Sequence, residues 1–104
     1  MPNVFEVVAE PSRRRILDLL QASPRAVNDL AEELGLAQPA VSKHLKVLRD
    51  VGLVTVDVDG QRRVYRLEAG PLRELDAWVA PYRRHWAAHL DALERHLDAK
   101  KEKP

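Results

Sequence analysis

Residues 35–50 read GLAQPAVSKHLKVLRD, and the rest of the fold can be worked out from this stretch in both directions. Gly35 suits the position just after a helix, because glycine enters the left-handed conformation without a steric cost. After a short turn, Val41, Leu45 and Leu48 recur at the spacing of one face of a helix. Two helices joined by so short a turn are typical of a helix-turn-helix motif.

Three helices are expected upstream of this turn, over residues 3–9, 11–22 and 28–34. Asn3 and Glu6 have the spacing of a capping box at the start of the first helix. Pro11 suits the first turn of the second helix, because its missing N–H group has no partner there in any case. The helix-turn-helix itself should then span residues 28–50.

The hydrophobic period changes to two after residue 50. From Val54 to Val58, valines alternate with polar residues, as in a half-buried strand. Asp59-Gly60 is a strong signal for a tight hairpin turn, and a second β-rich run ends at residue 67. The sequence therefore predicts a two-stranded wing hairpin over residues 53–67.

Together these elements predict a winged helix-turn-helix that is mainly α with a small β-hairpin (α+β). The predicted order is α-α-α-α-β-β-α, and we expect one domain over residues 1–104. A chain of this length buries only a modest core by itself, so a second copy sharing the burial is expected.

A last helix is expected over residues 71–98, kinked or broken near Pro81, because proline cannot donate a helical hydrogen bond. Its apolar residues step by threes and fours over about 42 Å, further than one small domain can cover. We expect a dimerisation helix; packing on its own domain is the alternative. The expected dimer interface consists of Phe5, Leu72, Leu75, Val79, Tyr82, Trp86, Leu90, Leu93 and Leu97.

The helix over residues 38–50 carries polar and basic groups opposite its core face. Gln38 and Ser42 can hydrogen-bond base edges in a DNA major groove, whereas lysine and arginine suit phosphates. His44 lies at the edge of the core face, where packing and DNA contact are equally open. The residues expected to contact DNA are Gln38, Pro39, Ser42, Lys43, His44, Lys46, Arg49, Arg62, Arg63 and Arg66. An ordinary solvated surface is the alternative.

The formal net charge of +1 at first argues against a nucleic-acid-binding chain. The distribution argues the other way. Residues 38–67 contain six basic and three acidic residues, whereas residues 71–99 contain four basic and five acidic residues. The basic charge is therefore concentrated on the expected DNA-binding elements.

Several functions are excluded by composition. The chain has no cysteine, so it has neither a disulfide framework nor a thiolate nucleophile. Its serines, Ser12, Ser23 and Ser42, lie outside any G-x-S-x-G setting, which argues against an enzyme. The start of the chain lacks the features of a secretory signal, and no apolar run is long enough for a membrane span. We expect a soluble cytoplasmic protein without a cofactor or a membrane partner.

Five stretches of the chain resemble the ArsR family of homodimeric bacterial winged-helix repressors: EPSRRRIL at 10–17, DLA at 29–31, QPAVSKHL at 38–45, GLV at 52–54 and residues 60–65. The resemblance covers about residues 5–97. It implies a double-stranded DNA operator as partner, with Gln38, Ser42 and His44 helping to read it. It also implies wing contacts from Arg62 and Arg63.

Three positions depart from the family pattern. Ala37 replaces a frequent serine, which removes a helix cap worth about 1 kcal/mol. Gln61 replaces a frequent arginine, so the wing contact would move to Arg62. Ala26 and Asn28 stand where metal-sensing members have cysteines, so that thiolate site is absent.

His85, His89 and His96 share one side of the last helix at a spacing that can place imidazoles on a metal ion. The Asp-x-His pattern of the family's histidine site is missing, since Asp76 is followed by Ala77 and Trp78. We therefore expect no metal, and a histidine-based metal-responsive repressor is the alternative. A winged-helix protein-interaction module without DNA binding is a second alternative. No effector is identified by the sequence.

Overall fold

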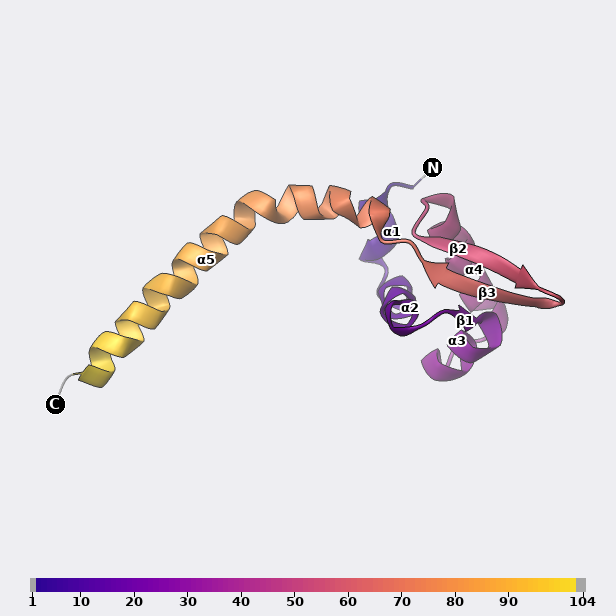
Figure 1. Ribbon diagram of the computed structural model, residues 1–104, viewed down its shortest axis with the longest axis horizontal. Helices are drawn as coiled ribbons and strands as arrows, with labels where there is room; N and C mark the ends of the chain where they lie inside the picture. The colour runs from indigo at the N-terminus through magenta and orange to yellow at the C-terminus, as the bar shows by residue number, and fades with distance from the viewer. Residues whose placement is uncertain (1, 103–104) are drawn as a thin grey trace. The chain divides into compact units, whose positions relative to one another are not determined.

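A computed structural model describes the backbone of residues 2–102 and the side chains of residues 2–98. The chain divides into two compact units, one up to Glu74 and the other from Leu75, and each is described by itself. The elements of the first unit are α1 (Val4–Ala9), α2 (Pro11–Ala22), β1 (Arg25–Ala26), α3 (Val27–Leu34), α4 (Gln38–Asp50), β2 (Val54–Asp59) and β3 (Arg62–Leu67) (Figure 1). A 3₁₀ turn, Gly70–Leu72, leads into α5 (Arg73–Glu102).

Side chains cap the first turns of α1 and α2 by accepting hydrogen bonds from backbone N–H groups. The Asn3 Oδ1 atom accepts a hydrogen bond from the Glu6 backbone N–H at 2.9 Å, as the capping-box spacing predicted. Glu10 caps α2 by accepting from the Arg13 backbone N–H at 3.1 Å. Ala37 precedes α4 without a side-chain cap, as expected for alanine at that position.

The sheet has three antiparallel strands in the order β1-β3-β2. Val54 pairs with Leu67 at the open end of the hairpin, and Asp59 pairs with Arg62 at the turn. Gly60 supplies the positive φ of 63° that this turn needs.

Several predicted details of the first unit were wrong, among them a start of α1 at residue 3 instead of Val4 and a start of the hairpin at residue 53 instead of Val54. We predicted a two-stranded hairpin, but a third strand, Arg25–Ala26, pairs with β3 opposite Tyr65 and Val64. A strand of two residues has no period for a sequence pattern to reveal. Helix α3 also begins at Val27, one residue earlier than expected.

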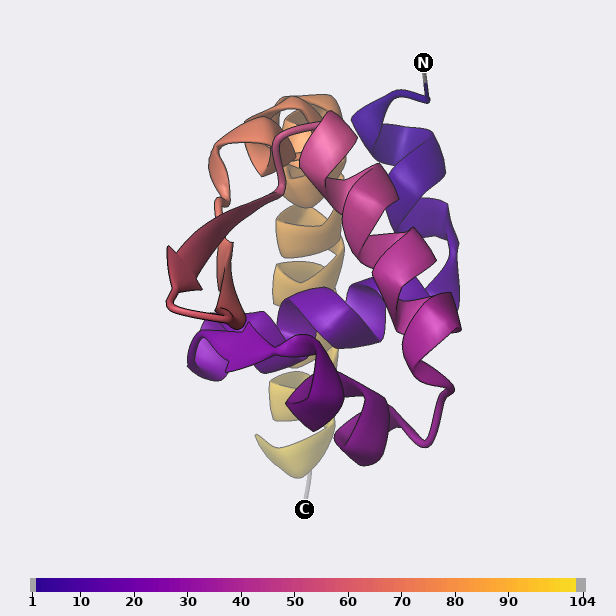
Figure 2. The same cartoon turned by 90° about the vertical axis from the view of Figure 1, so that its right-hand side faces the viewer.

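One core unites the helices with the base of the hairpin. Its fully buried side chains are Val7, Ile16, Leu30, Val41, Leu45, Leu48 and Leu53. They come from α1 to α4 and from the residue before β2, which explains why the helices of this unit are grouped together in Figure 2. The tip of the hairpin extends beyond the helices (Figure 1).

The second unit is the part of α5 from Leu75 onward, and the helix passes through Pro81 without a break. Helix α5 runs from Arg73 to Glu102, so it begins and ends later than the predicted range 71–98. Its ribbon changes direction within the orange section of Figure 1. Proline removes one helical hydrogen bond and commonly bends a helix in this way. Among the described residues, no helix is both long and apolar enough to cross a lipid bilayer.

Candidate nucleic-acid interface

Helix α4 has one buried face and one polar, exposed face. Val41, Leu45 and Leu48 are completely buried, so this side of the helix packs against the core. Six of the residues predicted to contact DNA are exposed on α4: Gln38, Pro39, Ser42, Lys43, Lys46 and Arg49. This face combines an amide, a hydroxyl and three cationic groups, which is a suitable set for base edges and phosphates.

The hairpin carries three further arginines that are predicted to contact DNA, and all three are exposed. Alternation along β3 places Arg62 and Arg66 on one face of the hairpin and Arg63 on the other. The three arginines were predicted as one group of DNA contacts, but they cannot all face the same surface. Arg63 shares its face with the buried Tyr65 and lies nearer the turn, beyond the helical core.

Val58 lies opposite Arg63 in the sheet register, and 69% of its surface is exposed. Val58 lies on the same face of the strand as Val54, which is buried. The pattern fails at Val58 because the end of the hairpin extends past the core. The hairpin therefore exposes an apolar side chain next to arginines near its tip, which the alternating pattern does not predict.

Two adjacent residues at the start of α3 contact both elements that are predicted to bind DNA. Gln38 Nε2 donates a hydrogen bond to Asn28 Oδ1 at 2.6 Å. Arg62 Nη2 lies 3.3 Å from Asp29 Oδ2. Between α3 and the hairpin lies a hollow of about 560 Å³, lined by Asn28, Asp29 and Arg62 among others. The contact between Arg62 and Asp29 could not be predicted from the sequence, because no local pattern relates residues 33 positions apart.

The other cations of the site differ in their partners. Arg66 forms an ion pair with Asp57 across the hairpin. Within residues 2–98, no ion pair is found for Lys43, Lys46 or Arg49. The exposed face of α4 is therefore the part of the site whose positive charge is least neutralised.

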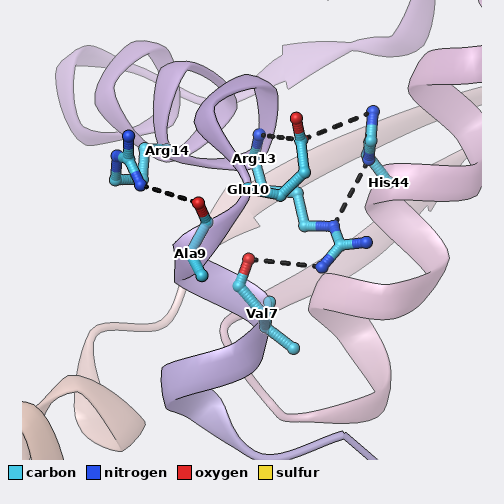
Figure 3. Close-up of polar contacts among 6 residues, drawn as sticks. All are labelled: Val7, Ala9, Glu10, Arg13, Arg14 and His44. Atoms are coloured by element: carbon cyan, nitrogen blue, oxygen red, sulfur yellow. Dashed lines mark hydrogen bonds and ion pairs between the residues drawn. The ribbon is translucent and has the colours of Figure 1, made fainter.

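His44 is turned away from this exposed face, toward α2. Its side chain is 22% exposed, and its ring lies between Glu10 and Arg13 (Figure 3). Partial burial acts to raise the pKa of the Glu10 carboxyl. The carboxylate accepts hydrogen bonds from the backbone N–H groups of Ser12 and Arg13, and it is also stabilised electrostatically by His44 and Arg13. These interactions outweigh the effect of burial, so the pKa of Glu10 lies below its usual value.

The residues expected at a dimer interface fall into two groups. Phe5, Leu72, Leu75 and Val79 are half-buried within the single chain. The remaining residues of the row, Tyr82, Trp86, Leu90, Leu93 and Leu97, are all exposed. An apolar row of this kind along one helix is unusual for a surface that faces only water.

The three histidines of α5 are exposed. His85 and His89 are one helical turn apart, and His96 lies two turns further on. Within the described part of the chain, no group of three or more histidine, cysteine, aspartate or glutamate side chains is placed to hold a metal ion.

The first unit combines helices α3 and α4 with a hairpin that follows α4 directly, and exposed cations lie on α4 and on the hairpin. This combination defines a winged helix-turn-helix DNA-binding regulator. The model of the arsR family of bacterial regulatory proteins matches residues 10–56. The chain belongs to this family. It is thus a DNA-binding transcription regulator and not an enzyme, and the predicted family and fold class are confirmed.

Individual relatives extend the match over most of the chain. The transcriptional repressor SdpR of Bacillus subtilis (strain 168) is 33% identical over 79 residues, which cover 76% of this chain and 88% of SdpR. The HTH-type transcriptional regulator NmtR of Mycobacterium tuberculosis (strain H37Rv) is 38% identical over 97 residues, which cover 93% of this chain and 79% of NmtR.

A solved structure supports the fold. It is the homodimeric winged helix-turn-helix DNA-binding domain of a possible ArsR-family regulator from Mycobacterium bovis. It is 32% identical to this chain and has a TM-score of 0.63, with 78% of this chain and 75% of that chain covered.

Proposed function

We propose that two copies of this chain form a homodimeric repressor that binds an imperfect palindromic operator. The observation that carries the proposal is the polar and cationic face of α4, which lies opposite three completely buried core residues. A helix held by its apolar face and exposing such groups is the arrangement by which helix-turn-helix proteins enter a major groove. A cytoplasmic location, where the DNA lies, belongs to the same proposal.

The DNA contacts divide by chemistry. Gln38 and Ser42 would read base edges, because an amide and a hydroxyl can both donate and accept hydrogen bonds. Lys43, Lys46 and Arg49 would contact phosphates, where a positive charge is needed more than a defined hydrogen-bond pattern. The wing would contribute Arg62 and Arg63 from its two faces.

Helix α5 would supply the dimer contact. A helix of 30 residues is about 45 Å long and needs extensive cover for one apolar row. Trp86 is 55% exposed and Leu90 is 57% exposed in the single chain, and aromatic and leucine side chains of this kind fit the core of a subunit interface. The related Mycobacterium bovis domain is homodimeric, which supports a second copy of this chain as the occupant.

Selection of bound fragments from genomic DNA, followed by footprinting of the best one, tests this proposal. We expect protection of two half-sites about one helical turn, or a multiple, apart. Equal binding to the selected duplex and to a scrambled one would contradict it and would favour a protein-interaction module.

The exposed histidines of α5 suggest a simple further measurement. Titration of the protein with zinc or nickel should leave the affinity for the selected duplex unchanged, because the described histidines lack additional ligands beside them. A metal-dependent change in affinity would instead support a histidine-based metal-responsive repressor.

A further inference from the structure

Glu10, Arg13 and His44 form a polar cluster between the start of α2 and the middle of α4, here called the α2–α4 cluster (Figure 3). Arg13 Nε donates a hydrogen bond to His44 Nδ1 at 3.4 Å. The other ring nitrogen, His44 Nε2, lies 3.7 Å from Glu10 Oε2. The same Glu10 oxygen accepts the backbone N–H of Arg13, so one carboxylate caps α2 and faces α4.

These contacts fix the orientation of the imidazole ring. Because Nδ1 accepts from a guanidinium group, a neutral ring carries its proton on Nε2, which points to the Glu10 carboxylate. Both nitrogens of His44 are therefore directed at α2.

Arg13 extends the cluster to a third helix. Its Nη1 atom donates to the Val7 carbonyl oxygen at 3.3 Å, near the end of α1. A single arginine thus connects α1, its own helix α2 and the middle of α4. The neighbouring Arg14 also donates to carbonyls at the end of α1, those of Val8 and Ala9, but none of its hydrogen bonds reaches α4.

We propose that the α2–α4 cluster sets the rotation of α4 about its axis, and that His44 is a positioning residue that acts without touching DNA. The inference rests on the proposed DNA contacts of α4. His44 lies between Lys43 and Leu45 in the sequence, so the contact with α2 acts in the middle of the proposed DNA-binding helix.

A small rotation is enough to matter. Side-chain tips lie about 5 Å from a helix axis, so a rotation of about 10° moves them by about 1 Å. Donor–acceptor distances in good hydrogen bonds vary by only about 0.5 Å. Base contacts by Gln38 and Ser42 would be lost first, whereas contacts of flexible lysines with phosphates would adjust. Loss of the cluster should therefore reduce discrimination between sequences more than it reduces binding to any DNA.

Arg13→Gln and Arg14→Gln form a matched pair for the test. Both remove one charge from α2 and hydrogen bonds to the end of α1, but only Arg13→Gln breaks the contact with α4. Fluorescence anisotropy would give the ratio of dissociation constants for a scrambled duplex and for the duplex that the wild-type chain selects. We expect Arg13→Gln to lower this ratio about tenfold, and Arg14→Gln to leave it within about twofold. Thermal unfolding of each variant would show that binding is measured on folded protein.

His44 variants separate positioning from direct contact. His44→Ala should lower the ratio about tenfold, and His44→Asn should restore most of it, because the asparagine oxygen can replace Nδ1 as the acceptor for Arg13. The double variant Arg13→Gln/His44→Ala should lose no more than either single variant, since both remove the same contact.

Three results would overturn this inference without affecting the proposed function. They are an unchanged ratio of dissociation constants for His44→Ala, an equal fall in this ratio for Arg13→Gln and Arg14→Gln, or reductions that multiply in the double variant. The third result would mean that His44 contacts DNA itself. A wild-type chain that selects no duplex would overturn the proposed function and this inference together.

Discussion

The exposed face of α4 carries two kinds of side chain, and we expect their removal to change DNA binding in different ways. Gln38→Ala should relax the preference at one base position and cost about 1–3 kcal/mol on the selected duplex, because an amide–base hydrogen-bond pair is lost. Lys46→Ala should weaken selected and scrambled duplexes alike and reduce the salt slope by about 1, since a phosphate contact carries no sequence information. Binding of both variants to a set of single-base variants of the duplex measures this. A uniform loss for Gln38→Ala would contradict the assigned role.

Asp29 would compete with DNA phosphates for Arg62, because the two side chains form an ion pair. Asp29→Asn should release the guanidinium and increase affinity for any duplex severalfold, with little change in unfolding free energy, because exposed ion pairs contribute less than about 1 kcal/mol. Glu32→Gln is a matched control, since it removes an exposed acidic charge from the same helix. The two variants would be compared by anisotropy at low salt. The same increase for both would show that only net charge matters.

Periodicity alone predicted which residues of α4 are exposed, because the buried positions Val41, Leu45 and Leu48 leave only one possible outer face. Partners of those residues could not be predicted. Asn28 lies in α3 and Glu10 precedes α2, and their contacts with Gln38 and His44 arise only when the chain is folded. His44 shows the limit most clearly, since its sequence position allowed both packing and DNA contact.

At the scale of elements, α5 concentrates the apolar surface that one chain leaves uncovered. Leu90→Glu should weaken the proposed dimer at least about tenfold, because a carboxylate would be placed in an apolar interface. Ala88→Glu is the control, because residue 88 lies on the opposite side of α5. Sedimentation at micromolar concentrations would measure both variants. Equal dissociation of the two variants, or no dissociation of Leu90→Glu, would show that the apolar row is not part of the interface.

Elements with strong repeating patterns were the predictable ones. Helices α2 and α4 have apolar residues at helical spacing, and the β2–β3 hairpin has alternation on either side of Asp59-Gly60. Strand β1 has only two residues, and its place in the sheet is defined by pairing with Tyr65 and Val64 on a distant strand. Only tertiary contact could reveal it.

At the scale of the whole molecule, charge distribution matters more than total charge. A net charge of +1 averages the basic elements α4 and β3 with residues 71–99, which contain four basic and five acidic residues. A dimer would present two copies of the basic surface, one for each half-site. The sequence indicated this distribution, but the arrangement of two chains depends on contacts that a single chain does not contain.

We propose that this chain binds one DNA sequence in preference to others through the face of α4 and the wing. Dissociation constants for the selected and the scrambled duplex, measured at several salt concentrations, test it most directly. We predict that both affinities fall steeply as salt rises, while the selected duplex remains at least about a thousandfold tighter at physiological salt. Equal affinity for the two duplexes, or binding that does not change with salt, would contradict the account.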